Sequence, residues 1–202
     1  MAGSRLSVAL GDGGLELPAV GRLAIFAPDA DFDLSALAQD QLEIVQSFHP
    51  DHASYNARGY SCVTECGTDY AASLVCLPRS KRQARALIAS AEAATPNGIL
   101  IVDGQKVSGV ESVLREMRVR VPIAGTISKS HGKLFWFKVD GCCFSDWAQP
   151  GMTVNSDGFL TVPGIFSADA VDPASALLAT HLPPKLGRVV ADLGAGWGYL
   201  AT

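Results

Sequence analysis

The chain has 202 residues, of which 48% are hydrophobic and 18% are charged, and its formal net charge is −4. This composition is that of a globular protein, and the length allows one full domain and part of a second. The acidic balance argues against a chain that binds nucleic acid over its whole surface, although it allows a local basic patch. The sequence contains no apolar run of about 18 residues and no secretory signal pattern in residues 1–10, so no membrane span or export is predicted.

Apolar runs predict a series of short strands in the first half of the chain. They cover residues 22–27, 42–48, 60–64, 72–77 and 99–102. Helices are predicted over residues 81–94, capped by Ser80, and over residues 110–117, while Asp33 is expected to cap one or two helical turns that reach Gln39. Continuously apolar strands that alternate with helices predict an α/β fold, with a Rossmann-like, mostly parallel sheet covered on both faces.

A hairpin and a change of composition mark the end of the first domain. Residues 125–130 and 133–139 flank the dipeptide His131-Gly132, which is typical of a hairpin turn. Residues 140–157 are rich in Gly, Ser, Asp and Pro, as linkers often are. The predicted domains are therefore residues 1–145 and residues 146–202, the second comprising a linker and the start of another domain.

The cysteines do not form a pattern typical of disulfide-bonded domains. They are Cys62, Cys66, Cys76, Cys142 and Cys143. An odd number at irregular spacing, without a secretory signal, predicts a reducing, cytoplasmic setting. Cys76 lies in an apolar run and is expected in the core. His49 and His52 precede Cys62 and Cys66, but this spacing differs from that of structural zinc sites, so no metal is predicted.

Residues 188–193 predict a strand, which Gly194-Ala195-Gly196-Trp197-Gly198 follows directly, and a helix is expected to start at Tyr199. Glycines allow positive φ angles and close approach of a ligand, and a helix N-terminus adds unpaired N–H groups. A dinucleotide motif fits poorly, because Tyr199 takes the third glycine position when the count starts at Gly194. Counted from Gly196, Ala201 fits that position, but two extra residues then separate strand and motif.

The stretch from Asp192 to Gly198, Asp-Leu-Gly-Ala-Gly-Trp-Gly, resembles motif I of class I methyltransferases. Residues 163–178 begin Pro-Gly-Ile-Phe-Ser and end in the pair Leu177-Leu178. They resemble the segment before motif I in the RsmC-like enzymes, a family that methylates the exocyclic amine of a guanine in small-subunit ribosomal RNA. Weaker likeness at residues 72–81 and 101–110 extends the resemblance to roughly residues 60–202.

The resemblance implies S-adenosylmethionine as the cofactor, a degenerate methyltransferase-like N-terminal domain, and the truncated start of a class I methyltransferase domain. Residues 27–31, Ala-Pro-Asp-Ala-Asp, agree with the degeneracy, because they follow the first strand without a glycine. Asp192 could accept a hydrogen bond from the cofactor's ammonium group, and Asp172 could also cap a helix. The implied cofactor-binding residues are Phe166, Ser167, Asp172, Ser175, Asp192, Gly194, Ala195, Gly196 and Gly198.

The same resemblance places the catalytic residues, including an Asn-Pro-Pro-aromatic motif, beyond Thr202. The 202 residues alone are therefore expected to bind no S-adenosylmethionine and to be inactive. In the whole enzyme, an exocyclic guanine amine would attack the sulfonium methyl group in line, without a metal. The implied partner is ribosomal RNA or the small ribosomal subunit, and the N-terminal part would assist RNA recognition and the stability of the fold. An NAD(P)-dependent oxidoreductase and a non-catalytic α/β binding module remain alternatives.

Two groups of cations are candidates for contacts with RNA phosphates. The first stands at the start of the predicted helix 81–94 and consists of Arg79, Lys81, Arg82 and Arg85. It either binds RNA or forms a solvated helix face. The second lies on the predicted hairpin and consists of Lys129, His131 and Lys133, with Phe135 and Trp136 beside them. Trp136 either stacks on a base or packs on the sheet.

Overall fold

The computed structural model describes residues 4–149, 151–162 and 164–202, and the chain divides into unit 1, Met1–Ala148, and unit 2, Gln149–Thr202. The strands of unit 1 are β1 (Leu23–Phe26), β2 (Leu42–Val45), β3 (Ser61–Val63), β4 (Ala72–Cys76), β5 (Ile99–Gln105), β6 (Gly125–Lys129) and β7 (Gly132–Lys138). Its helices are α1 (Arg5–Leu10), η1 (Gln39–Gln41), α2 (His49–Ala57), α3 (Lys81–Ala94), η2 (Lys106–Ser108), α4 (Val110–Arg118) and η3 (Ser145–Trp147). No helix among the described residues is long and apolar enough to cross a bilayer.

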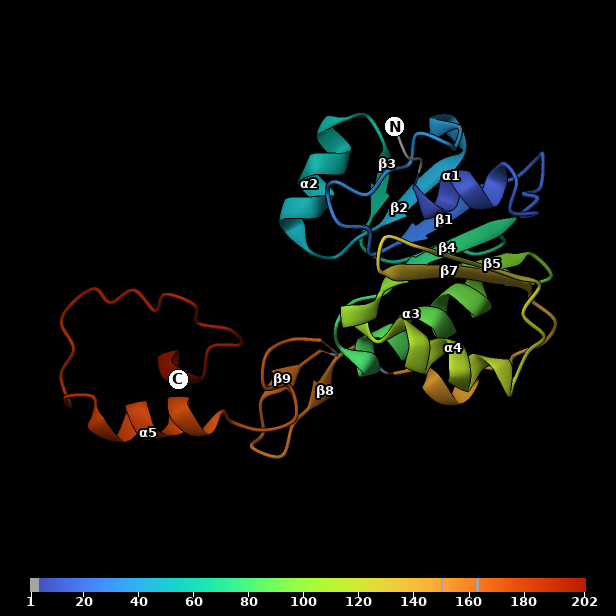
Figure 1. Ribbon diagram of the computed structural model, residues 1–202. Helices are drawn as coiled ribbons and strands as arrows, with labels where there is room; N and C mark the ends of the chain where they lie inside the picture. The colour runs from blue at the N-terminus through green and yellow to red at the C-terminus, as the bar shows by residue number, and fades with distance from the viewer. Residues whose placement is uncertain (1–3, 150, 163) are drawn as a thin grey trace. The chain divides into compact units, whose positions relative to one another are not determined.

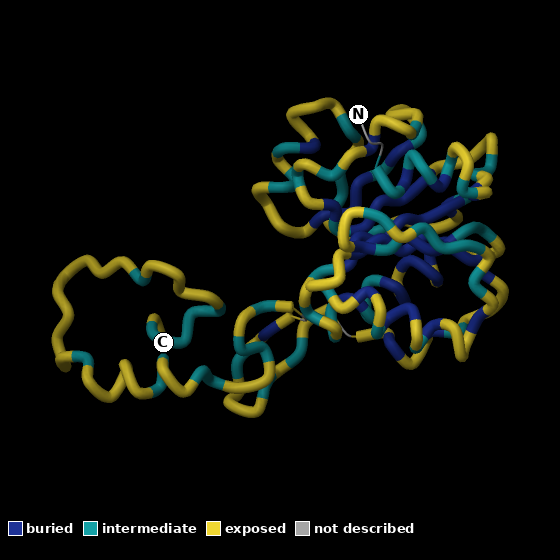
Figure 2. Tube along the Cα trace, viewed as in Figure 1, coloured by how far each residue is buried: buried dark blue, intermediate teal, exposed yellow. Residues whose placement is uncertain are grey.

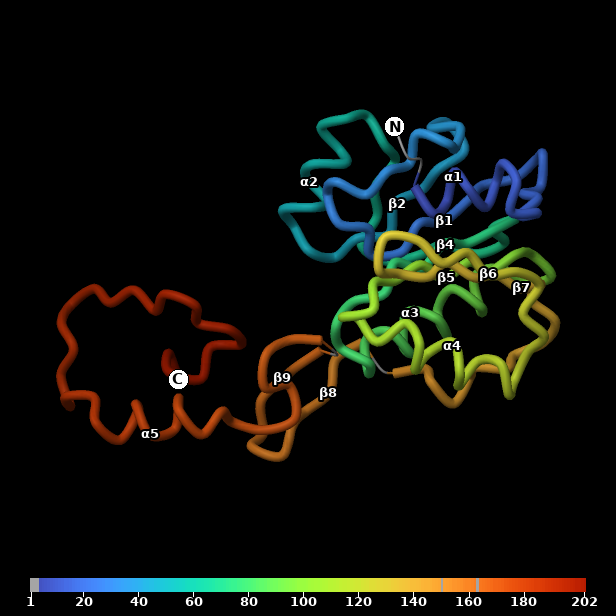
Figure 3. The backbone as a smooth tube through the Cα atoms, viewed as in Figure 1, coloured from blue at the N-terminus to red at the C-terminus, as the bar shows by residue number. Residues whose placement is uncertain are grey.

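The seven strands of unit 1 form one sheet in the order β3-β2-β1-β4-β5-β7-β6 (Figure 1). The pairs among β1 to β5 are parallel, with Leu23 opposite both Leu42 and Ala72. Strand β7 is antiparallel to β5 and to β6, and the hairpin that it forms with β6 lies along β5 (Figure 3). The order differs from the dinucleotide-binding order 3-2-1-4-5-6 by one antiparallel strand between the last two. The predicted mostly parallel α/β fold is confirmed.

Side chains that alternate along the strands fill two cores, one on each face of the sheet. Ala24 and Phe26 point into the core beneath α3, α4 and η3, whereas Leu23 and Ile25 point into the core beneath α1 and α2. Figure 1 shows these helices on opposite faces, and Figure 2 shows the buried residues concentrated between them. A sheet covered on both faces explains why its central strands are continuously apolar in sequence.

Helix α3 has the bounds that its sequence predicts. The hydroxyl of Ser80 caps it by accepting a hydrogen bond from the amide of Gln83 at 3.3 Å. Ala84, Ile88 and Ala91 lie at helical spacing and are fully buried. The cap and the apolar stripe act within a few residues of each other, so this helix is readable from local sequence alone.

A buried carboxylate on α3 holds the last part of unit 1 in place. Glu92 is 4% exposed, and its two oxygens accept hydrogen bonds from the amides of Cys143 and Phe144 at 2.8 and 2.9 Å. Phe144 and Trp147 then pack together with a ring-centroid distance of 4.8 Å. Residues up to Trp147 therefore belong to unit 1.

The predicted hairpin is present, with its turn shifted by one residue. Ser130 and His131 form the turn and have φ angles of 50° and 56°, as a type I′ turn requires. Gly132 pairs with Lys129 as the first residue of β7. A Cβ atom on Gly132 would stand 2.6 Å from the carbonyl oxygen of Gly104, so a glycine is needed inside this strand.

Three segments of unit 1 differ from the prediction. Helices α1 and α2 were not expected. The segment that begins α2 follows the strand predicted over residues 42–48, and Pro50 stands in the first helical turn, where its missing N–H has no intrahelical role. The helical turns predicted after Asp33 are absent, because its carboxylate accepts hydrogen bonds from the amide and hydroxyl of Ser35 in a local turn.

Unit 2 contains a two-stranded hairpin and two short helices. Its elements are β8 (Thr153–Val154), β9 (Leu160–Thr161), α5 (Pro173–His181) and η4 (Tyr199–Ala201). Thr161 alone is buried among its described residues. The strand predicted over residues 188–193 is wrong: Val189 and Leu193 are 94% and 93% exposed in an irregular segment. Because β8 and β9 pair only with each other, no strand in the described part of unit 2 offers this segment a hydrogen-bonding neighbour.

Candidate functional site

A small cavity of unit 2 brings together the two sequence segments singled out for a cofactor. Its volume is about 70 Å³. Eight of the nine predicted cofactor-binding residues line it, namely Phe166, Ser167, Asp172, Ser175, Asp192, Gly194, Ala195 and Gly196. Gly198, the ninth, ends the same turn and caps η4. Pro163, the first residue of the upstream segment, lies outside the described residues.

The glycine turn has the backbone that its composition predicts. Gly194, Gly196 and Gly198 have φ angles of 82°, 59° and 91°, in the region that favours glycine. A Cβ atom at Gly194 or Gly198 would meet nothing within 4 Å. The glycines are therefore needed for backbone conformation, and the space over the turn is open to another molecule.

Asp192 contributes the clearest sign of a missing partner. Its Oδ2 atom is shielded from solvent and has no hydrogen-bond partner among the described residues of the chain. A buried acceptor without a donor costs about 1–3 kcal/mol, and more when it is charged. The residue lines the cavity beside the open glycine turn. This arrangement suits a ligand that carries a hydrogen-bond donor, and an ammonium group most of all.

The upstream wall of the cavity is organised by the start of α5. Asp172 is the N-cap, and its Oδ2 atom accepts hydrogen bonds from the amide of Ser175 at 2.8 Å and from its hydroxyl at 3.1 Å. Asp172 and Ser175, which were both predicted to contact the cofactor, are thus fixed by hydrogen bonds to each other. Phe166 is 68% exposed, and Ser167 has a φ angle of 50°. The capping role expected of Asp172 is confirmed, whereas its contact with a cofactor stays a prediction.

Trp197, in the middle of the glycine turn, was not recognised from the sequence as a site residue. Its indole Nε1 donates a hydrogen bond to the carbonyl of Ser167 at 3.3 Å. Its ring packs on Phe159 with a centroid distance of 4.5 Å, and Tyr199 completes the aromatic cluster. Trp197 thereby ties the glycine turn to the upstream wall. A bulky aromatic residue between glycines is the signal that could have revealed it.

The size of the cavity limits what these residues can do by themselves. A volume of about 70 Å³ holds about two water molecules, whereas small-molecule sites usually measure about 300–1,000 Å³. The described residues of unit 2 therefore form part of the wall of a ligand site and do not enclose one.

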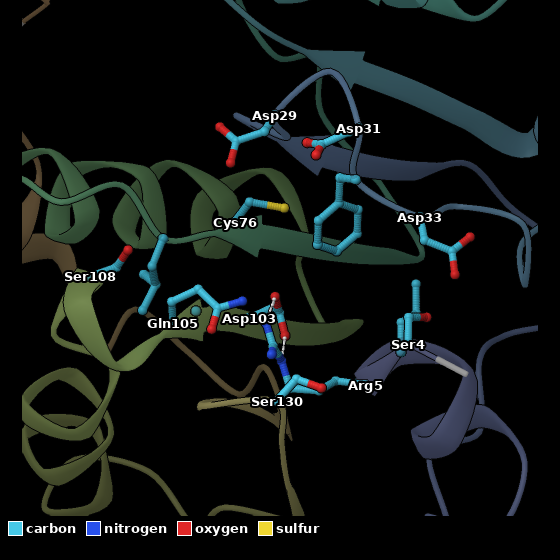
Figure 4. A pocket seen from close by; sticks show the side chains of 14 residues that line it. Ser4, Arg5, Asp29, Asp31, Asp33, Cys76, Asp103, Gln105, Ser108 and Ser130 are labelled. Carbon is cyan, nitrogen blue, oxygen red and sulfur yellow. Dashed lines mark hydrogen bonds and ion pairs between the residues drawn. The ribbon is translucent and has the colours of Figure 1, made fainter. Parts of the chain in front are cut away.

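Unit 1 has a larger cavity, of about 360 Å³, at the carboxyl ends of β1, β4 and β5 (Figure 4). In open α/β sheets this is where ligands bind, beside the point at which the strand order reverses. Here Arg5 enters from α1 and grips Asp103, with Nε to Oδ1 at 2.6 Å and Nη2 to Oδ2 at 2.8 Å. The two side chains are 10% and 7% exposed. The chain thus supplies its own cation where a ligand's polar group could have been bound.

The loop after β1, which lines the cavity of unit 1, differs in sequence from the glycine turn that lines the cavity of unit 2. Residues 27–31 contain no glycine, and Ala27 takes a φ angle of 50°. Asp29 and Asp31 point toward the cavity (Figure 4). Partial burial, followed by the negative charges of Asp51 and Asp31, raises the pKa of Asp29. These features agree with a degenerate first domain, which stays a prediction.

The basic residues at the start of α3 are partly neutralised within unit 1. Lys81 and Arg85 both form ion pairs with Glu116 on α4. Partial burial alone would raise the pKa of Glu116, but the hydrogen bonds from the two cations outweigh it and lower that pKa. Arg85 also lies over the ring of Trp147, with its Cζ atom 5.2 Å from the ring centroid. Arg79 is exposed.

The remaining candidates have structural positions. Trp136 is 5% exposed within the core, so the alternative that it stacks on a base is wrong. Cys76 is buried as predicted, and burial raises the pKa of its thiol. His49 and His52 lie on α2, and across the described ranges the structure gathers no three potential metal ligands.

Comparison with known proteins finds similarity to methyltransferases. The family model "Methyltransferase small domain" matches residues 157–202. The ribosomal RNA small subunit methyltransferase C of Pectobacterium atrosepticum is 32% identical over 135 residues, covering 62% of this chain and 37% of the relative. The protein of the same name from Pseudomonas paraeruginosa is 31% identical over 138 residues, covering 65% and 42%. The chain thus spans about two fifths of the length of these relatives.

Among solved structures, the T. thermophilus 16S rRNA N2 G1207 methyltransferase (RsmC), in complex with AdoMet and guanosine, matches with a TM-score of 0.61. The match has 19% identity and covers 82% of this chain and 49% of that one. The fold is therefore that of the class I methyltransferases. In sequence the chain is similar to the ribosomal RNA small subunit methyltransferases C, which is the resemblance that its motifs predicted.

Proposed function

We propose that the chain is part of an S-adenosylmethionine-dependent methyltransferase that modifies the exocyclic amine of a guanine in small-subunit ribosomal RNA. The proposal draws on its relatives, which are named small-subunit ribosomal RNA methyltransferases. The observation that carries it is the unpartnered Oδ2 atom of Asp192 beside the open glycine turn. The ribosome as partner implies action in the cytoplasm.

The residues of unit 2 fit the amino-acid end of this cofactor. Asp192 would accept a hydrogen bond from the ammonium group, which would satisfy its unpartnered oxygen. The glycine turn would let the backbone approach the rest of the molecule. When bound, the cofactor supplies a methyl group on a positively charged sulfur. The part of the reaction that these residues perform is binding and orientation, which make the attack effectively intramolecular.

The 202 residues by themselves are expected to show no measurable affinity for S-adenosylmethionine. The cavity of about 70 Å³ leaves the cofactor largely in water, and a site that does not bury its ligand gains little from apolar contact. Isothermal titration calorimetry with the 202-residue chain checks this expectation. Micromolar binding would show that the cavity opens around the cofactor without further walls.

The test of the function uses the natural protein that contains these residues and follows transfer of a tritiated methyl group to unmethylated small ribosomal subunits. Asp192→Asn should weaken S-adenosylmethionine binding by roughly tenfold to a hundredfold, because a charge-assisted hydrogen bond is lost. Asp140→Asn makes the same chemical change at an exposed position of unit 1 and should leave binding unchanged.

Three results would overturn the proposal. The first is equal cofactor affinity in Asp192→Asn and the unaltered protein. The second is binding of a nicotinamide dinucleotide in place of S-adenosylmethionine, which would favour an oxidoreductase. The third is binding of neither ligand. Absence of both ligands from the natural protein would leave a non-catalytic binding module as the better description.

A further inference from the structure

Unit 1 has a strongly basic groove at the edge of the sheet where β5 ends and the β6–β7 hairpin turns. The groove measures about 310 Å³, and its charged lining consists of Lys106, Lys129, Lys133 and Glu111, with His131 beside them. Lys106 follows β5, Lys129 and Lys133 flank the hairpin turn, and the amide of Lys106 donates a hydrogen bond to the carbonyl of His131 at 2.8 Å. Cations from separate parts of the chain therefore meet in one place.

The first turn of α4 links this groove to the basic start of α3. On one side, Lys133 lies 3.4 Å from the carboxylate of Glu111. On the other side, Lys81 donates a hydrogen bond to the hydroxyl of Ser112 at 3.3 Å. Glu111 and Ser112 are adjacent in α4, so its first turn lies between the cations of the hairpin and those of α3. We call this surface the basic edge and define it as Arg79, Lys81, Lys106, Lys129 and Lys133.

Positive charge exceeds negative charge along the basic edge. Among the described residues, Glu111 pairs with Lys133, and Glu116 pairs with Lys81 and Arg85. Helix α4 starts at Gly109 without a side-chain cap, so its N-terminus adds a partial positive charge. In a chain with a net charge of −4, this surface is a local concentration of positive charge.

Aromatic side chains are not available for base stacking at this surface. Phe135 and Trp136, which follow Lys133, are 0% and 5% exposed. Side chains that contact bases give sequence specificity, whereas lysines and arginines on phosphates give position and affinity. The basic edge therefore suits a polyanionic backbone that is read by charge and not by sequence.

We propose that the basic edge of unit 1 is a docking surface for the sugar-phosphate backbone of RNA. This proposal rests on the proposed function, in which RNA is the substrate. It adds which surface of unit 1 would bind the RNA and by what interactions. It combines members of the two cation groups that the sequence singled out and adds Lys106 to them. Binding by this surface should be insensitive to RNA sequence and steeply dependent on salt.

The experiment measures binding of the 202-residue chain to a labelled 16S ribosomal RNA transcript, without cofactor, at several salt concentrations. Lys106→Gln/Lys129→Gln should weaken binding by roughly tenfold or more at 0.1 M salt and lower the magnitude of the salt slope by about 1 to 2. The matched control is Arg118→Gln/Lys138→Gln. It removes the same charge from the last turn of α4 and from the far end of β7, both exposed, and should have a much smaller effect.

Equal losses in the two double variants would overturn the proposal, because they would reflect net charge alone. Equal affinity of the basic edge for polyglutamate and for RNA would also overturn it in favour of an acidic protein partner. Asp192→Asn separates this proposal from the proposed function: it should reduce methyl transfer at low S-adenosylmethionine concentration in the natural protein, while RNA binding is unchanged. RNA binding without methyl transfer in the unaltered natural protein would refute the function and retain the docking surface.

Discussion

The two units differ in where they bury their side chains and where they leave space for a ligand. Unit 1 has a complete sheet with a core on each face, yet Arg5 occupies the end of the sheet where a ligand could bind. Unit 2 has an open glycine turn and an unpartnered Asp192, yet Thr161 alone is buried among its described residues. Packing and the presence of open space for a ligand are thus separable properties. One unit can have a full core and a filled sheet end, and another can present site residues with little core beneath them.

Hydrogen exchange of the 202-residue chain should show the largest difference between the units. The slowest amides of β1, β4 and β5 should exchange only through global unfolding, which corresponds to about 5–15 kcal/mol. Amides of residues 188–193 lack strand partners, and their protection should be close to 0 kcal/mol. Mass spectrometry of exchanged peptides measures both. Protection of residues 188–193 equal to that of β4 would contradict the description of unit 2.

Removal of the internal cation tests whether unit 1 depends on its filled site. Arg5→Ala should lower the free energy of unfolding by about 3–5 kcal/mol, because it leaves the buried carboxylate of Asp103 uncompensated. Urea unfolding followed by fluorescence measures the change. Arg22→Ala is the control: Arg22 is 55% exposed in its pair with Glu43, so its loss should cost below about 1 kcal/mol. Equal effects would show that the Arg5 pair is not a buried one.

The carboxylate that holds residues 143–144 gives a smaller test of the packing in unit 1. Glu92→Gln should lower the free energy of unfolding by about 1–3 kcal/mol, because one of two buried backbone amides loses its acceptor. Glu16→Gln, at an exposed position, should have no measurable effect in the same urea titration. An unchanged Glu92→Gln variant would mean that this segment contributes little to the unit.

The smallest expected effect depends on pH. Because the pKa of Glu116 is lowered in the folded chain, its ion pairs stabilise the fold above its usual value of 4.5, and this contribution is lost as the pH falls through the folded-state pKa. Glu116→Gln should therefore cost roughly 0.5–1 kcal/mol at neutral pH, since its cations are partly exposed, and almost nothing in strong acid. Urea unfolding at both pH values measures the difference. A constant difference would exclude the ion pairs as its source.

Elements set by neighbours in the sequence were predictable. Helix α3 has its cap and its apolar stripe within residues 80–94, and the central strands of unit 1 are continuous apolar runs. Helix α2 was missed because its Pro50 fits the start of a helix as well as a turn. The strand expected at residues 188–193 was wrong because a strand exists only with a partner, and apolar sequence does not supply one.

The candidate site was predictable where one short motif defines it. The glycine turn and the upstream segment were both assigned to one site from sequence resemblance, and they line the same cavity. The contact between Arg5 and Asp103 joins residues 98 positions apart, so no local pattern could reveal it. The basic edge was only partly predicted from the sequence, because it depends on the start of α3, η2 and the hairpin turn lying at the same edge of the sheet.

The hydrogen bond from Trp197 to Ser167 has an optical consequence. Trp136 and Trp147 are enclosed in unit 1, whereas Trp197 is half-buried in unit 2 beside Phe159. With the two enclosed indoles replaced by phenylalanine, emission would come from Trp197 alone. Any movement of the glycine turn away from Ser167 would then change the emission wavelength of Trp197. The fluorescence of Trp197 would therefore report whether the two sides of the unit 2 cavity are in contact.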